Sequence, residues 1–483
     1  RLYPAKGTYT SGNPNQAASY TCSWHAVRVR LVQAGSRRTN MRHIDIHKLG
    51  DDARFTRLHA IVLAMCTLVI IFDGYDLAVA GIALPSIMRE MGIKATSAGF
   101  MVSTALFGMM FGAVIFGTIA DRIGRRWTIA ACVLLFSVFT AAAGFARDPV
   151  TFGAFRFVAG LGIGGVMPNV VAQMSEYSPR KIRSTMVTLM FSGYSVGGML
   201  AALLGKGLIE RFGWQSVFIA AGLPVLLIPF VLRMMPESMA FLLRTGRTDA
   251  LRSIAARLVP DYVPQEGDRF VLSDGGTARA TPIGKLFQDG RAFGTVMLWI
   301  AFFMCLFMVY ALSSWLAKLM ASAGYTLGSA LTFVLVLNLG AMIGAIGGGW
   351  LADRFNIKHV LACMYALAAV SITLLGFKMP TPVLFFVVGL AGASTIGTQI
   401  LTYAYAGQFY PLAIRSTGIG WASGFGRSGA ILAPIIIGIL MEMALPLKLN
   451  FVAIAAPAVI ATIAVLFMDK NRQSVAAVEQ ATA

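Results

Sequence analysis

The sequence predicts an all-α membrane protein whose twelve transmembrane helices form two pseudo-symmetric bundles of six. Of its 483 residues, 57% are hydrophobic and only 13% are charged, which is far more apolar than an ordinary soluble domain. The apolar residues gather in twelve runs of roughly 20 residues or more, the length that a helix needs to cross a bilayer core. In addition, motifs of the first half return in the second half at a constant offset.

Six of these runs precede a long polar stretch at 236–291, and six follow it. We therefore predict a first bundle at 58–235, a cytoplasmic central loop at 236–291 and a second bundle at 292–468. The individual spans are expected at 58–82, 96–119, 127–146, 150–174, 185–209, 214–235, 292–317, 326–351, 358–378, 381–406, 415–440 and 446–468.

Polar segments flank the two bundles. Residues 41–57 are expected to form a cytoplasmic lead-in and residues 469–483 a cytoplasmic tail. Residues 1–40 carry six basic and no acidic residues and lack the apolar core of a signal peptide. We interpret them as a tag or upstream translation without a fold of their own.

The net charge is +19, from 40 Lys and Arg against 21 Asp and Glu. In a soluble protein this excess would indicate nucleic acid, but here most basic residues lie in the loops on one side of the predicted spans. The positive-inside rule then places both termini and the central loop in the cytoplasm. We therefore expect a lipid bilayer around the chain and no nucleic-acid partner.

No sequence pattern indicates a cofactor, a metal site or an enzyme. The five cysteines form no CxxC pair, and four of them fall in apolar spans as small buried hydrophobes. The chain lacks the GxxxxGK[ST] phosphate loop of ATP-driven pumps, and its five histidines show no metal-ligand or triad spacing. The GxGxxG match at 160–165 lies inside an apolar span, where close helix packing explains it.

The two halves of the chain are related by an internal repeat. The sequence GTIADR at 117–122 recurs as GWLADR at 349–354, and PRKIRST at 179–185 recurs as PLAIRST at 411–417, both at an offset of 232 residues. Duplicated six-helix halves are the layout of a secondary transporter, with the substrate site at mid-membrane between the halves.

An acidic pair, Asp73 and Asp76, lies inside the first predicted span. A carboxylate at that depth is costly unless it is paired, hydrated or protonated, and residues three apart share one face of a helix. The repeat places Cys305 and Met308 at the matching positions of the second half, so the pair is not a feature of the repeated unit. The pattern predicts a proton-coupled transporter; the alternative is a polar pair that only braces the helix.

The loop at 117–127, GTIADRIGRRW, joins the second and third spans. Its glycines allow close helix approach and a tight turn, and a carboxylate there can bond backbone N–H groups or a nearby arginine. We predict a latch that holds the halves together on the cytoplasmic side in one state only; the alternative is a charged loop that fixes topology. In the second copy Asn356 replaces the glycine.

This loop resembles the signature loop of the major facilitator superfamily, and the resemblance covers nearly all of 41–470. FRFVAGLG at 155–162, EYSPRKIR at 176–183 and PES at 236–238 are similar to other motifs of that superfamily. DGYD at 73–76 resembles the aromatic acid:proton symporters, and GLGIGGVMPNVVA at 160–172 is most similar to bacterial benzoate transporters. The resemblance implies a monomeric, multi-pass carrier in the bacterial inner membrane that imports an aromatic carboxylate, benzoate or a hydroxybenzoate, together with a proton.

The resemblance assigns Asp73 and Asp76 to proton coupling or substrate transport. Arg156 and Arg427 lie well inside spans four and eleven, and a buried arginine needs an anionic partner. Each is expected either to pair with an aspartate or to bind the substrate carboxylate by a two-pronged hydrogen bond. The expected cytoplasmic gate consists of Gly117, Asp121, Arg122, Gly124, Arg125, Glu176, Arg183, Asp353, Arg354 and Arg415.

An aromatic carboxylate also needs a flat apolar slot and polar groups at its rim. Candidates for this cavity are intramembrane polar and aromatic residues, for which helix packing is the competing explanation: Asn169, Tyr310, Asn338, Gln399 and Tyr403. Two other functions stay open, proton-antiport efflux and reception of aromatic acids without transport. The fifth span lacks the proline expected of efflux carriers, and no long signalling domain supports a receptor.

Overall fold

The computed structural model describes residues 43–51, 53–259, 262, 268–271, 283–288, 290–410 and 414–468, without the side chains of 43, 47, 48, 184, 415 and 416. Twelve helical segments in this part of the chain are long and apolar enough to cross a membrane. The prediction of twelve spans in an all-α fold is therefore confirmed. The predictions for residues 1–40 and for the tail at 469–483 lie outside the described residues.

The first bundle consists of α3 (Arg57–Met91), α4 (Ala95–Ile123), α5 (Arg125–Ala143), α6 (Pro149–Tyr177), α7 (Arg183–Phe212) and a broken sixth span. That span was predicted as one helix but comprises α8 (Gln215–Ala220), η1 (Leu223–Leu227) and α9 (Ile228–Met234). Pro224 and Pro229 lie in the first turns of η1 and α9. Proline has no N–H to continue the preceding helix, so each one starts a new segment.

The second bundle repeats this order with unbroken helices, some of which begin at a capping side chain. Thr326 and Asn356 accept backbone N–H groups at the starts of the second and third, as Asp148 does before α6. The helices are α12 (Ala292–Ser322), α13 (Leu327–Arg354), α14 (Ile357–Leu374), α15 (Thr381–Phe409), α16 (Arg415–Glu442) and α17 (Leu447–Phe467).

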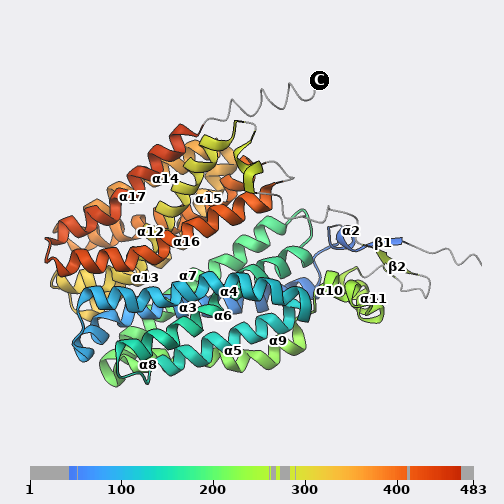
Figure 1. The fold of residues 1–483 in the computed structure, drawn as a ribbon, viewed down its shortest axis with the longest axis horizontal. Helices are drawn as coiled ribbons and strands as arrows, with labels where there is room; N and C mark the ends of the chain where they lie inside the picture. Colours follow the sequence, from blue (N-terminus) through green and yellow to red (C-terminus); the bar gives the residue numbers. More distant parts are fainter. Residues whose placement is uncertain are drawn as a thin grey trace, which may run out of the picture.

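The two bundles lie side by side and meet through α3 with α12, α4 with α16 and α7 with α13 (Figure 1). Glycines permit the closest contacts: a Cβ added to Gly81 would lie 2.1 Å from the carbonyl oxygen of Ser313, and one on Gly99 would lie 2.4 Å from that of Pro434. Two small residues thus let backbones of opposite halves touch.

The contacts between the halves gather at one end of the molecule, which we call the closed end and which holds the turn between α3 and α4. There Lys94 Nζ lies 3.2 Å from Glu442 Oε1, and the Ser103 hydroxyl donates to the Ile431 carbonyl at 2.8 Å. Toward the other end, the loop-rich end, the helices of the two bundles diverge (Figure 1).

The loop-rich end carries small elements where the sequence predicted only a lead-in and a polar loop. These are β1 (His43–Asp45), α2 (Ile46–Asp51), α10 (Met239–Arg244), α11 (Thr248–Leu258), β2 (Arg269–Val271) and η2 (Ile283–Phe287). The two strands pair in parallel, with Ile44 opposite Phe270. Helix α11 buries Leu251, Ile254 and Leu258. A short amphipathic helix that packs on a bundle has no membrane-length apolar run, so hydropathy alone missed it.

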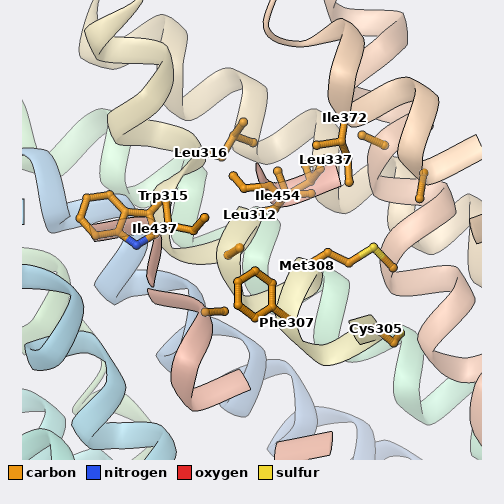
Figure 2. Packing of buried hydrophobic residues seen from close by; sticks show 14 of the residues in the cluster. Cys305, Phe307, Met308, Leu312, Trp315, Leu316, Leu337, Ile372, Ile437 and Ile454 are labelled. Atoms are coloured by element: carbon orange, nitrogen blue, oxygen red, sulfur yellow. The ribbon is translucent and has the colours of Figure 1, made fainter. Parts of the chain in front are cut away.

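The positions that match the acidic pair lie in an apolar core in the second bundle. Cys305 and Met308 on α12 are fully buried in one hydrophobic cluster with Leu312, Leu337 and Ile454, and Figure 2 shows them packed among these side chains. Cys66 and Cys132 are also buried free thiols, but Cys363 is exposed on α14, which corrects its prediction as a buried residue. The acidic pair of the first half therefore has apolar residues at its matching positions in the second half.

Candidate functional site

The centre of the site is an ion pair between Asp76 on α3 and Arg156 on α6. Arg156 Nη1 donates to Oδ1 and Oδ2 of Asp76 at 3.0 and 2.9 Å and to the Thr140 hydroxyl at 2.9 Å. Its Nη2 donates to the Asp76 carbonyl at 3.2 Å. Both side chains are only about 1% exposed. The pair thus satisfies two buried charges that would each be unstable alone, and Arg156 is the arginine that partners an aspartate.

Asp73, one turn earlier on α3, has the opposite environment. Its side chain is fully buried, and neither carboxyl oxygen has a hydrogen-bond partner in the described part of the chain. Groups from four other helices lie within electrostatic range of it: Cys132 on α5, Tyr194 on α7, Tyr310 on α12 and Arg427 on α16. Asp73 therefore lies where the two halves meet, with its hydrogen-bonding capacity unused.

The two residues between the aspartates, Gly74 and Tyr75, each make a contact that positions α3 against a neighbouring helix. A Cβ on Gly74 would lie 2.2 Å from the Tyr194 carbonyl oxygen, so only glycine lets α3 and α7 approach this closely. The Tyr75 hydroxyl donates to the Val217 carbonyl of α8 at 2.9 Å. Sequence reasoning found the acids through the cost of charge in a membrane, but nothing in the sequence identified these two contacts.

Arg427 is a half-buried cation on α16. None of the ion pairs among the described residues includes it. It lies within electrostatic range of Asp73 and Tyr310. Tyr403 also lies within range of Tyr310, and its hydroxyl lies 2.8 Å from Ser423 Oγ. The structure thus brings together Asp73 of the first half with Tyr310, Tyr403 and Arg427 of the second.

The predicted amide ligands are largely occupied by their own helices. Asn169 donates to the carbonyls of Gly165 at 2.8 Å and Phe116 at 3.3 Å, and Asn338 donates to the Val334 carbonyl at 2.9 Å. Asn338 lies on the seam between the halves, because a Cβ on Gly198 would approach its side chain to 2.3 Å. Gln399 is half-buried on α15. These contacts favour the packing explanation for both asparagines.

An apolar groove of about 590 Å³ runs along α12 and α16 and was not predicted as a unit. Trp299 stacks on Trp421 with ring centroids 6.2 Å apart and an angle of 12° between the planes. The remaining lining residues are Thr417, Gly420, Gly424, Phe425 and Ser428.

The loop between α4 and α5 is held by a carboxylate from the central stretch. Glu237 Oε1 accepts the N–H groups of Arg126 at 3.1 Å and Ser238 at 2.9 Å. A Cβ on Gly124, whose φ is 97°, would lie 2.5 Å from Glu237 Oε2. The carboxylate therefore occupies the positive end of α5, and glycine is required for both the backbone conformation and the space.

The other gate residues also bond within the first half. Glu176 pairs with Arg125 and accepts the Ser238 hydroxyl and the Ala240 N–H. Two further gate residues form ion pairs, Arg183 with Asp51 and Asp121 with Arg244. Arg122 is exposed, and a Cβ added to Gly117 would meet no atom within 4 Å.

In the second half, Asp353 and Arg354 are exposed, and the Arg354 guanidinium lies 4.2 Å from the centre of the Trp350 ring. The side chain of Arg415 lies outside the described residues. No ion pair among the described residues joins the halves at the loop-rich end, so the latch stays a prediction for another conformation.

Comparison with known proteins identifies the architecture. Residues 66–356 and 338–482 match the family model of the Major Facilitator Superfamily. The chain is 47% identical over 437 residues to the benzoate transport protein of Acinetobacter baylyi. This match covers 89% of this chain and 94% of that protein. It is 33% identical over 438 residues to a 4-hydroxybenzoate transporter of the same organism, with 88% and 94% covered.

Among solved structures, the fold is similar to the xylose transporter of Escherichia coli in a partially occluded inward open conformation. The TM-score is 0.65 at 16% identity, and the match covers 85% of this chain and 98% of that one. At this identity the likeness concerns the fold alone. Together with the sequence matches, it shows that this multi-pass membrane chain belongs to the major facilitator superfamily, a family of transporters rather than enzymes, and within it to the group of bacterial aromatic acid transporters.

Proposed function

We propose that this chain is a proton-coupled symporter that imports benzoate or a hydroxybenzoate by alternating access. The observation that carries the proposal concerns Asp73 and Arg427 from opposite halves. Among the described residues, the buried carboxyl group of Asp73 has no hydrogen-bond partner, and it lies in electrostatic range of Arg427, which has no ion-pair partner there. One group can take up a proton and the other an organic anion. The names of the similar proteins support the choice of an aromatic acid.

The direction of transport rests on the positive-inside rule. The loop-rich end carries the basic loops, so we place it and both ends of the described chain in the cytoplasm. The closed end, with the Lys94–Glu442 pair, then faces the periplasm. In this orientation the structure is an inward-facing state, and rocking of the halves about α3, α4, α12 and α16 would expose the site to the other side.

Substrate binding follows from the charges at the site. The charge of Arg156 is balanced by Asp76, whereas Arg427 has no ion-pair partner in the described part of the chain and can hold a carboxylate by two parallel hydrogen bonds. The aromatic rings near it supply the apolar slot: Tyr310, and Tyr403 with Phe302 edge-on at 4.9 Å. We place the substrate ring against these side chains.

Reconstituted vesicles test the function. With an inward proton gradient, wild type should accumulate labelled benzoate uphill, and a protonophore should abolish the accumulation. Arg427→Gln should raise the KM for benzoate about tenfold or more through loss of a charge-assisted pair, whereas Arg233→Gln, at an exposed position, should match wild type. Accumulation that survives the protonophore contradicts proton symport, gradient-driven export indicates antiport, and binding without flux indicates a receptor.

A further inference from the structure

The two aspartates of α3 share a helix face and are both buried, but they differ in their hydrogen-bond partners. Asp76 accepts two hydrogen bonds from Arg156 on its side chain and one on its carbonyl. Asp73 accepts none in the described part of the chain, although it is equally buried. A carboxylate paired with a fixed cation has little to gain from a proton, whereas a buried carboxyl without hydrogen bonds becomes the neutral acid once it loses the charge that balances it.

We propose that Asp73 alone carries the transported proton, that Asp76 is the fixed counter-ion of Arg156, and that Arg427 couples proton to substrate because two carboxylates compete for its single charge. This division of tasks rests on the proposed symport and refines it. It makes Asp76 a positioning residue: its ion pair holds α3 against α6 and fixes the place of Asp73 one turn away.

The competition follows from counting charges around Arg427. In the empty carrier, ionised Asp73 balances the Arg427 cation. When a substrate carboxylate takes over that cation, Asp73 loses its counter-charge and binds a proton from water. Both states of the cluster are neutral. A cluster with substrate but no proton carries one negative charge, and one with proton but no substrate carries one positive charge; both are unfavourable when the halves close around them.

The route of the proton is assigned to two phenols from opposite halves. Tyr194 on α7 and Tyr310 on α12 interact through their side chains, and each lies within electrostatic range of Asp73. Both are half-buried, whereas Asp73 is fully buried. Tyr310 packs against all three hydrophobic clusters of the described chain. Rocking of the halves separates these phenols, so access to Asp73 changes with the conformation.

All charged and titratable groups that the structure places around Asp73 enter this account. They are Asp76 on its own helix, Cys132 on α5, Arg156 on α6 through Asp76, Tyr194 on α7, Tyr310 on α12 and Arg427 on α16. Cys132 is a buried free thiol, and of the two groups the carboxyl of Asp73 is the stronger acid.

The decisive experiment measures protons taken up when benzoate binds. Purified protein in a weakly buffered solution with a pH indicator should take up about one proton per benzoate bound. Asp73→Asn should bind benzoate with no proton uptake. The double variant Asp76→Asn with Arg156→Gln removes both buried charges together and should still take up a proton. Proton uptake by Asp73→Asn, or its loss in a double variant that binds benzoate, overturns the proposal.

The pH dependence of benzoate affinity gives a second measurement that does not depend on the double variant. For wild type, the Kd should rise about tenfold per pH unit above the point where Asp73 loses its proton in the empty carrier. For Asp73→Asn the Kd should be flat, and for the exposed control Asp249→Asn it should follow wild type. A slope in Asp73→Asn equal to that of wild type refutes the assignment.

The phenols are tested by removing single hydroxyl groups. Tyr194→Phe and Tyr310→Phe should slow proton-driven uptake about tenfold or more, as for loss of a positioned proton-transfer group, with Tyr325→Phe at the closed end as the matched control. If wild type shows no proton-driven uptake, the proposed symport fails. If wild type is proton-driven and Asp73→Asn is equally so, symport stands and only this division of tasks fails.

Discussion

At the scale of single residues, one helical turn separates two carboxyl groups with opposite surroundings. Asp76 finds Arg156 on α6, and Asp73 finds Arg427 across the seam between the halves. The sequence predicted that acids and arginines this deep would need one another. It did not predict which would pair, because Asp76 and Arg156 are 80 residues apart and no local spacing encodes their contact.

Removing one partner of this ion pair should reduce stability more than removing both partners. Asp76→Asn leaves Arg156 buried without an anion, which should reduce stability by about 3–5 kcal/mol. Adding Arg156→Gln should restore much of that loss, because no uncompensated charge remains. Thermal unfolding followed by tryptophan fluorescence measures both. Additive losses in the double variant would show that the side chains contribute independently of each other's charge.

Gly74 should tolerate no side chain. Gly74→Ala places a methyl group 2.2 Å from the Tyr194 carbonyl oxygen, so α3 and α7 must move apart at a cost of about 1–3 kcal/mol. Gly207→Ala is the matched control on α7, because a Cβ there meets nothing within 4 Å. We expect Gly74→Ala to melt at a lower temperature than wild type and Gly207→Ala to melt at the same temperature as wild type. Equal melting temperatures for the two variants would contradict the contact.

At the scale of elements, the long helices could be predicted from hydropathy, whereas their breaks and attachments could not. The sixth span is divided into three helical segments, and the second and third segments each have a proline in their first turn. The helices α10 and α11 lie in a stretch whose overall polarity concealed their buried faces. A window long enough to detect a span averages over features this short.

Helix α5 depends on a carboxylate from another element for its start. Its N-cap residue, Gly124, has no side chain, and Glu237 takes the position of a capping group. Glu237→Ala should therefore lower stability by about 1–2 kcal/mol, with Glu237→Gln in between. Asp249→Ala, with a side chain 95% exposed, is the control. Unfolding curves that superimpose for Glu237→Ala and wild type would rule out the cap.

At the scale of the whole molecule, the repeat predicted two bundles, and the structure gives their contacts. The way in which the halves lie against each other was beyond prediction. It depends on contacts across the seam, such as Gly81 with Ser313 and Ser103 with Ile431. Such contacts join residues over 200 positions apart, and no local pattern reports them.

The closed end offers a direct test of the rocking motion. Cysteines in place of Lys94 and Glu442, whose charged atoms lie 3.2 Å apart across the halves, should be joined by a short bifunctional thiol reagent. Cross-linking should stop benzoate uptake, and a reducible reagent should allow recovery. Cysteines in place of Glu90 and Gln215, which bond at 2.8 Å within the first half, are the control. Full uptake by the cross-linked Lys94–Glu442 pair would exclude movement at this end.

The short parallel ladder at the loop-rich end has a mechanical consequence. Ile44 precedes the first span and Phe270 lies in the stretch that connects the bundles, yet the two are paired. The pairing therefore joins the connector, near its middle, to the segment that leads into the first bundle. Measured along the chain, the covalent connection from this point to α12 is much shorter than the whole stretch between the two bundles.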